Sequence, residues 1–249
     1  MNLNCYGKSH VGLKRSENQD SFLLIEKEHQ TLAIVCDGIG GGNAGDVASR
    51  MATAHLKDRF EKTEVVESDI EVKHWLEKVI QEANDLIFTQ STKKIEQKGM
   101  GTTLVGVLVC EQATYIFNVG DSRTYGLYED DFLCLTEDHT YVAGLLKRGE
   151  VSEEEAMKHP NRNVLTNALG IWDNVQIDIN KIQNDYQSLL VCSDGLHGYV
   201  SEDTIRFILD SKNHSTQEKV EVLVQDALDA GGYDNITVII LEKDGVQHG

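Results

Sequence analysis

The chain has 249 residues, of which 23 are basic and 41 acidic, so its formal net charge is −18. This acidity argues against a nucleic-acid-binding surface, which needs clustered cations, and against docking on an anionic membrane. Because 40% of the residues are hydrophobic, the composition is that of a globular protein rather than a disordered one.

Short apolar or β-branched runs between turn residues predict strands, and apolar positions recurring about every 3.6 residues predict helices. In chain order we predict strands at 21–26 and 31–36, helices at 44–60 and 69–90, strands at 103–109, 113–119, 122–128 and 131–135, short helices and turns at 139–168, a strand at 188–193, a helix at 216–230 and a strand at 235–241. Tight turns such as Gly120-Asp121 indicate antiparallel hairpins. The grouping predicts an α+β fold with helices packed on antiparallel sheet.

The chain reads as one continuous domain, 1–249. It has a single proline and no Pro-rich or Ser/Gly-rich linker, and 139–168 reads as a surface insertion. No apolar run approaches the ~18–20 residues of a membrane span, and the first residues lack the pattern of a secretory signal. The five cysteines include no Cys-x-x-Cys pair, which favours reduced thiols over a zinc site or disulfides. We expect a cytoplasmic protein.

Five aspartates occur at the ends of predicted strands or in a hairpin turn: Asp20, Asp37, Asp121, Asp194 and Asp234. If 21–26 and 31–36 form an antiparallel hairpin, the start of one lies beside the end of the other, so Asp20 and Asp37 meet at one rim. Asp194 and Asp234 reach the same rim if their strands are also antiparallel. An isolated Asp-Gly pair is usually only a turn, but five acids at one rim are harder to explain that way.

Carboxylates gathered in one crevice repel each other unless a cation is present. Oxygen ligands select hard divalent ions such as Mg²⁺ or Mn²⁺ over zinc. Arg15, five residues before Asp20, supplies a guanidinium that could bind a phosphate bidentately. Divalent metals together with an arginine indicate phosphoryl chemistry.

A second motif competes with this interpretation. Gly40, Gly42 and Gly45 fit the Gly-x-Gly-x-x-Gly pattern of dinucleotide-binding sites, after a predicted strand and before a predicted helix. Such a site needs a second parallel strand that ends in an acid about 20 residues later. Glu64 and Glu67 are near that spacing, but a helix follows them, so we disfavour this alternative.

The ordered motifs resemble the metal-dependent type 2C protein serine/threonine phosphatases, and most of all their compact bacterial members. They span about residues 7–241 and comprise Arg15 to Asp20, AspGlyIleGlyGlyGly (37–42) with AlaGlyAsp (44–46), GlyMetGlyThrThr (99–103), ValGlyAspSerArg (119–123), AspHisThr (138–140), AsnAlaLeuGly (167–170), CysSerAspGlyLeu (192–196) and GlyGlyTyrAspAsnIleThr (231–237). Each motif alone is weak, whereas the ordered set is specific.

The resemblance implies a central antiparallel β-sandwich flanked by helical layers, with two Mn²⁺ or Mg²⁺ ions and a third at one end. By the same resemblance, Asp37 would bridge two ions, Gly38 would offer its carbonyl, Asp194 and Asp234 would bind the second ion, and Asp121 with Asp194 would hold the third. Asp20 would orient water, Arg15 would bind the substrate phosphate, and 139–168 would contain a flap.

The activity implied by the resemblance is hydrolysis of phosphoserine and phosphothreonine in proteins, counteracting a bacterial serine/threonine kinase. A metal-activated water would attack phosphorus in line, without a phosphoenzyme. No cysteine has an arginine six residues later, so a cysteine nucleophile is not supported. We expect a monomer whose partners are phosphorylated proteins and a cognate kinase.

Two positions depart from the family pattern. Ile39 stands where animal members carry a histidine taken as the general acid, and Gln19 stands where a glutamate is usual. His197, three residues after Asp194, could replace the acid, although a structural role is the stronger reading. Two alternatives remain open: an inactive scaffold that binds phosphoproteins, and a phosphatase dedicated to a sigma-factor regulator.

Overall fold

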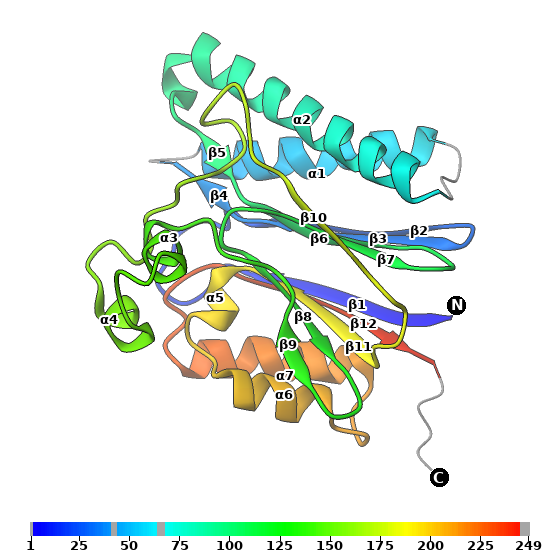
Figure 1. The fold of residues 1–249 in the computed structure, drawn as a ribbon. Helices are drawn as coiled ribbons and strands as arrows, with labels where there is room; N and C mark the ends of the chain where they lie inside the picture. Colours follow the sequence, from blue (N-terminus) through cyan, green and yellow to red (C-terminus); the bar gives the residue numbers. More distant parts are fainter. Residues whose placement is uncertain (1, 41–43, 64–67, 245–249) are drawn as a thin grey trace.

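Two antiparallel five-stranded sheets stacked face to face form the centre of the molecule (Figure 1). The computed structural model describes residues 2–40, 44–63 and 68–244. One sheet has the order β10-β7-β6-β3-β2, the other has the order β1-β12-β11-β8-β9, and β4 pairs with β5 in a short ribbon. The strands are β1 (Leu3–His10), β2 (Ser21–Lys27), β3 (Gln30–Cys36), β4 (Gly38–Ile39), β5 (Gly101–Thr102), β6 (Leu104–Val109), β7 (Thr114–Val119), β8 (Arg123–Leu127), β9 (Phe132–Cys134), β10 (Asp178–Ile182), β11 (Ser188–Cys192) and β12 (Ile236–Lys243).

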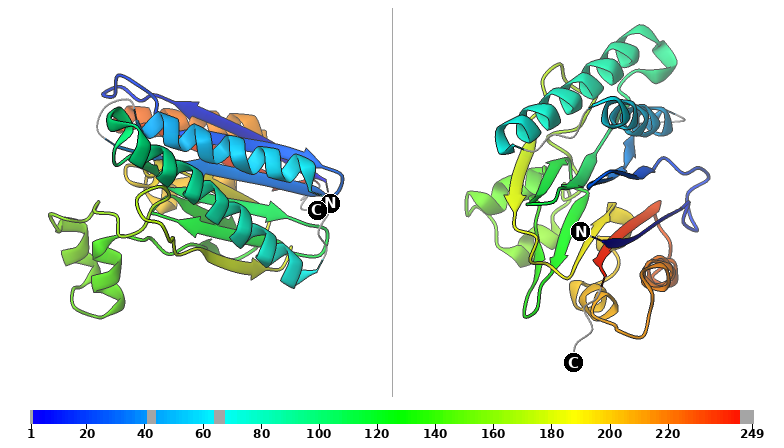
Figure 2. Two further views of the ribbon diagram at one scale, coloured as in Figure 1. Left: turned by 90° about the horizontal axis from the view of Figure 1, so that it is seen from above. Right: turned by 90° about the vertical axis from the view of Figure 1, so that its right-hand side faces the viewer.

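Helices cover the outer face of each sheet, which gives the four layers α-β-β-α (Figures 1 and 2). α1 and α2 pack on the first sheet, whereas α6 and α7 pack on the second. The short helices α3 and α4 lie within 139–168 and project beside one end of the sandwich. The α+β class and the layered architecture are therefore confirmed. The predicted hairpin around Gly120-Asp121 is wrong, because β7 and β8 belong to different sheets and the turn between them crosses from one sheet to the other. The helices are α1 (Gly45–Lys62), α2 (Asp69–Lys93), η1 (Ile95–Gln97), α3 (Tyr141–Lys147), α4 (Glu153–Lys158), α5 (Asp194–His197), α6 (Glu202–Leu209) and α7 (Thr216–Asp229).

The continuous apolar run of β3 follows from burial on both faces of the strand. Ala33 and Val35 belong to the core between the two sheets. Leu32 and Ile34, which point the opposite way, belong to the core under α1 and α2. Every residue of β3 is buried, so the strand that leads to Asp37 is held rigidly from both sides.

The sequence patterns missed β1, β10 and α6, as well as the very short elements β4, β5, η1 and α5. β1 and β10 are edge strands, and each carries several polar residues because only part of its surface is covered. α6 is short, and its start is marked by Ser201, whose side chain accepts a hydrogen bond from the backbone N–H of Thr204. Weak apolar patterning in short or edge elements accounts for these misses.

The strand pairing is incompatible with a dinucleotide-binding unit. β3 has β2 on one side and β6 on the other, and both neighbours are antiparallel to it. The parallel second strand that such a unit requires is therefore not beside β3. Gly42, Glu64 and Glu67 of that alternative lie outside the described residues.

Candidate active site

Four of the predicted acids flank paired strand ends at one end of the sandwich. Ser21 of β2 pairs with Cys36 of β3, so Asp20 and Asp37 flank the same end of this pair. Cys192 of β11 pairs with Val238 of β12, so Asp194, which follows β11, and Asp234, which precedes β12, flank the same end of theirs. Antiparallel pairing thus brings acids from distant parts of the chain to paired strand ends.

A cleft of about 620 Å³ opens at this end of the molecule. Arg15, Asp37, Gly38, Asp121, Asp194 and Asp234 all line it, together with Asn163 and Leu165 from the 139–168 segment. Six of the seven predicted site residues are therefore collected in one cavity. The seventh, Asp20, lies buried under the cleft, where its Oδ2 accepts hydrogen bonds from Ser193 Oγ at 2.8 Å and Thr237 Oγ1 at 2.6 Å.

Asp37 is fixed through its backbone. Its N–H donates to Thr103 Oγ1 at 2.9 Å, and its carbonyl accepts from Thr102 Oγ1 and from the N–H of Thr103, both at 2.9 Å. At the next position a side chain cannot fit, because a Cβ on Gly38 would lie 2.3 Å from the carbonyl oxygen of Gly45 and 2.6 Å from that of Gln19. Glycine at this position therefore permits the close backbone approach on which the cleft floor depends.

Asp194 and Asp121 are positioned by neighbouring buried groups. A Cβ on Gly195 would lie 1.9 Å from the carbonyl oxygen of Asn235, so only glycine lets the start of α5 approach the start of β12. His197 Nε2 lies 3.0 Å from the carbonyl oxygen of Asp121 and donates to it. Burial lowers the pKa of His197 to about 4, so its imidazole is neutral and braces the Asp121 turn rather than facing substrate.

Burial and mutual repulsion both disfavour the charged form of the carboxylates in the cleft. Burial, followed by the charges of Asp20, Asp194 and Asp121, raises the pKa of Asp37 well above its usual range. Burial and the charge of Asp194 raise the pKa of Asp121 to about 7. Burial and the charge of Asp234 raise the pKa of Asp194. Repulsion of this kind is relieved by protonation or by a bound cation.

The donor set fits a hard divalent cation that keeps part of its water shell. Asp194 Oδ1 is a buried carboxylate oxygen without a hydrogen-bond partner among the described residues, which leaves it available as a ligand. Across the described ranges, no three His, Cys, Asp or Glu side chains converge tightly enough to form a cage by themselves. Mg²⁺ and similar ions use one or two carboxylates plus waters, which suits this arrangement.

Arg15 forms an ion pair inside the same cleft. Its Nη2 donates to Asp234 Oδ2 at 2.7 Å, and this bond raises the pKa of the guanidinium. The Arg15 side chain is 55% exposed and that of Asp234 is 25% exposed. The pair therefore joins the two side chains to which the resemblance assigns a metal and the substrate phosphate.

Several supporting residues were not singled out from the sequence. Asn235 ties the Arg15 loop to β12, because its Oδ1 accepts from the N–H of Gln19 at 2.8 Å and its Nδ2 donates to the carbonyls of Val11 and Glu17. Thr103 and Ser193 anchor Asp37 and Asp20 as described above. Each lies within a motif that was recognised, so only their position next to an aspartate could have pointed to them.

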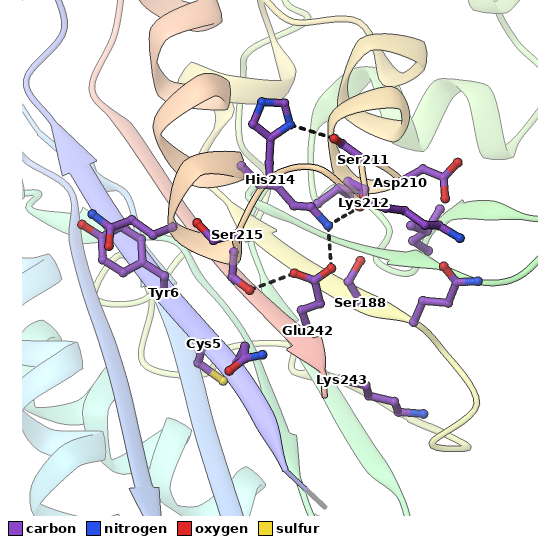
Figure 3. A pocket seen from close by; sticks show the side chains of 17 residues that line it. Cys5, Tyr6, Ser188, Asp210, Ser211, Lys212, His214, Ser215, Glu242 and Lys243 are labelled. Carbon is purple, nitrogen blue, oxygen red and sulfur yellow. Dashed lines mark hydrogen bonds and ion pairs between the residues drawn. The ribbon is translucent and has the colours of Figure 1, made fainter. Parts of the chain in front are cut away.

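A second pocket, of about 590 Å³, lies under the loop that joins α6 to α7 and holds none of the predicted site residues (Figure 3). Its buried amine, Lys219 Nζ, contacts Glu242 Oε1 at 2.5 Å and the carbonyl of Leu209 at 2.8 Å. Thr216 Oγ1 donates to the other oxygen of Glu242 at 2.8 Å. These charges neutralise each other, whereas the acids of the first cleft outnumber its single arginine.

Comparison with known proteins agrees with the geometry of the cleft. The family model described as Protein phosphatase 2C matches residues 6–230. The serine/threonine phosphatase stp of Listeria monocytogenes serotype 4b (strain F2365) is 42% identical over 240 residues, covering 96% of this chain and 95% of its own. Protein phosphatase PhpP of Streptococcus pneumoniae serotype 2 (strain D39 / NCTC 7466) is 35% identical over 235 residues, covering 93% of this chain and 94% of its own.

Solved structures show the same architecture. The crystal structure of serine/threonine phosphatase Stp1 from Staphylococcus aureus superposes with a TM-score of 0.93 at 35% identity, covering 98% of this chain and 96% of that one. A bacterial serine phosphatase gives 0.92 at 34% identity, covering 99% and 100%. The chain belongs to the protein phosphatase 2C family, the metal-dependent protein serine/threonine phosphatases.

Proposed function

We propose that this phosphatase hydrolyses phosphoserine and phosphothreonine in proteins with two Mn²⁺ or Mg²⁺ ions and a third. Asp37, the Gly38 carbonyl, Asp194 and Asp234 would bind the first two ions. Asp121 and Asp194 would bind the third. The observation that carries the proposal is the gathering of four carboxylates and Arg15 in one cleft. Bound divalent cations supply acidification of water and neutralisation of phosphate charge.

The residues of the chain orient the reaction around that charge. Arg15 would turn from Asp234 to the phosphate and grip two of its oxygens. Asp20, held through Oδ2 by Ser193 and Thr237, keeps Oδ1 free of a partner among the described residues and would order water from below. Attack by a water oxygen on phosphorus breaks the bond to the Ser or Thr oxygen, which takes up a proton. No covalent bond to the protein forms.

The proton for the leaving oxygen comes from solvent in the cleft rather than from a histidine. Ile39 lies at the position where animal family members carry that acid, and the described residues that line the cleft include no histidine. His197 is committed to Asp121, as shown above. Gln19 contributes no charge next to the ions, and its backbone carbonyl accepts from Ser49 Oγ at 2.6 Å instead.

The biological partners follow from this chemistry. A bacterial serine/threonine kinase would supply the phosphorylated proteins, and the 139–168 segment, which contributes Asn163 and Leu165 to the cleft wall, would act as a flap that selects among them. None of the helices in the described ranges combines the length and apolar character of a bilayer span. We place the reaction in the cytoplasm, carried out by a monomer.

Release of inorganic phosphate from a phosphothreonine peptide tests the proposal. Wild type should release phosphate only with added Mn²⁺ or Mg²⁺, and Asp194→Asn should lose both turnover and metal binding by calorimetry. Asp210→Asn, which removes an exposed acid at the end of α6, is the matched control and should behave as wild type. Metal binding without hydrolysis would contradict the enzyme proposal, and absence of both would favour the scaffold alternative.

A further inference from the structure

Two exposed tyrosines stack on each other in the segments that follow Asp194 and precede Asp234. The rings of Tyr199 and Tyr233 are stacked, with centroids 5.5 Å apart and planes inclined by 27°. Tyr199 is 44% exposed and Tyr233 is 53% exposed, so the pair presents apolar ring surface to solvent. We refer to Tyr199 and Tyr233 together as the tyrosine ledge.

The ledge is built from segments that also build the site. Tyr233 directly precedes Asp234, and Tyr199 follows the α5 turn that begins at Asp194. A Cβ on Gly231 would lie 2.2 Å from the Tyr233 ring, so glycine there lets the ring fold back over the loop. The next glycine, Gly232, accepts hydrogen bonds from the N–H groups of Leu13 and Lys14, just before Arg15.

The ledge lies next to Arg15, because Tyr233 directly precedes Asp234 and Asp234 Oδ2 accepts a hydrogen bond from Arg15 Nη2 at 2.7 Å. Burial and the charges of Asp194 and Asp234 raise the pKa of Tyr199, while Arg15 and Arg162 act in the opposite direction. Arg15 belongs to the N-terminal wall, and Arg162 precedes Asn163, which lines the cleft from the 139–168 segment. The ring pair is therefore next to the place where a phosphate held by Arg15 would sit.

We propose that the tyrosine ledge binds an uncharged apolar or aromatic side chain next to the phosphorylated residue of a protein substrate. This inference rests on the proposed function, because it takes the phosphate to be held by Arg15. Consecutive residues of an extended peptide lie about 3.3–3.6 Å apart, so the side chain of a residue that flanks the phosphorylated one is within reach of rings next to Arg15.

The charges around the ledge have both signs, so a charged side chain would meet repulsion as well as attraction there. Lys14 Nζ already lies 6.0 Å from the centroid of the Tyr233 ring, and with Arg15 and Arg162 it would repel a basic side chain. The carboxylates of the cleft would repel an acidic one. An apolar or aromatic side chain gains ring contact and burial without either cost.

Two series of phosphothreonine substrates test the ledge. Wild type with Mn²⁺ should prefer peptides with Leu or Phe beside phosphothreonine over the Gly peptide, at one of the two flanking positions. The double variant Tyr199→Ala/Tyr233→Ala should lose this preference, with kcat/KM for the Leu and Phe peptides falling about tenfold, mostly through KM. Hydrolysis of phosphothreonine blocked by acetyl and amide groups, which has no flanking side chain, should be unchanged.

Three controls separate the possible outcomes. Tyr199→Phe/Tyr233→Phe should keep the preference, and Phe207→Ala, which truncates an aromatic that is 78% exposed on α6, should change nothing. If wild type releases phosphate from none of the peptides with Mn²⁺, the proposed function fails. If wild type hydrolyses the peptides but the double variant keeps the same preference among them, the ledge proposal alone fails. The ledge could instead join two copies of the chain. In that case wild type would sediment as a dimer and the double variant as a monomer, while both kept the same peptide preference. This result would also overturn the proposal.

Discussion

Arg15 lies where the proposed phosphate site and the proposed metal site meet. Its guanidinium lies 2.7 Å from Asp234, and both side chains line the cleft. The ion pair offsets one carboxylate charge, whereas Asp37, Asp121 and Asp194 form no salt bridge within the described ranges. A role in gripping phosphate is distinct from a role in holding Asp234, because the two roles affect different measured quantities.

We expect Arg15→Ala to raise KM for a phosphothreonine peptide by roughly 10–100-fold, with a much smaller change in kcat, because a charge-assisted hydrogen bond contributes about 1.5–3 kcal/mol. Arg15→Lys should recover only part of the loss, since an ammonium cannot form the bidentate fork. Steady-state kinetics on both variants measures this, with exposed Arg206→Ala on α6 as the control. An unchanged KM would show that Arg15 does not hold phosphate.

The carboxylates could be predicted from the sequence, whereas the side chains that hold them could not. Asp37 and Asp194 follow apolar runs, and that pattern is readable without a structure. The roles of Thr102 and Thr103 depend on hydrogen bonds to the backbone of Asp37, 65 and 66 residues away in the sequence. Hydroxyl side chains occur at many positions, and only the fold decides which of them meets an aspartate.

At the scale of single elements, α7 is anchored to the sheet by a buried ion pair (Figure 3). Lys219 reaches from α7 to Glu242 at the end of β12, and its side chain is 3% exposed. We expect Lys219→Met to lower the free energy of unfolding by about 3–5 kcal/mol, because it leaves a partly buried carboxylate without its cation. Urea unfolding followed by circular dichroism measures the change. Lys212→Met, an exposed lysine of the same pocket, should cost less than about 0.5 kcal/mol, and equal losses in both variants would contradict the role of the pair.

The packing of α1 on α2 should make stability depend on pH. His55 of α1 has its Nε2 3.3 Å from Glu82 Oε2 of α2, and burial and the nearby charge of Arg59 lower its pKa in the folded protein, against the opposing effect of Glu82. The unfolded chain then binds the proton more readily than the folded one. The stability contributed by neutral His55 is present above its unfolded pKa of about 6.5 and is lost as pH falls below it.

His55→Gln removes this titrating group, so the variant should lose less stability than wild type between pH 7.5 and pH 5.5. Urea unfolding at the two pH values gives the comparison, because the other titrating groups are common to both proteins. Parallel losses in the two proteins would show that His55 does not contribute to the pH dependence.

For the whole molecule, the layered fold could be predicted from the sequence, but the edge strands and their pairing partners could not. The apolar runs of β3, β6, β11 and β12 are buried on both faces. Continuous apolar runs of this kind predict central strands from the sequence alone. Antiparallel pairing of β2 with β3 then brings Asp20 and Asp37 to the same end of the sheet, as the sequence predicted. Edge strand β1 pairs with β12 from Leu3 with Lys243 to His10 with Ile236, near opposite ends of the chain, and no local pattern encodes so distant a partner.

We expect the same rim to make the stability of the entire protein depend on divalent cations. The folded chain brings Asp37, Asp121 and Asp194 into mutual repulsion, whereas the unfolded chain separates them, so ions that bind only the folded state stabilise it by mass action. At 100 times its dissociation constant, Mn²⁺ should add about 2.7 kcal/mol, which raises the thermal midpoint by about 5–10 °C. Differential scanning fluorimetry measures this shift, and NaCl at equal ionic strength controls for screening of the net charge of −18. Asp194→Asn should lose most of the Mn²⁺ shift while keeping the response to NaCl. If Mn²⁺ and NaCl gave equal shifts in both proteins, the carboxylates of the cleft would not be metal ligands.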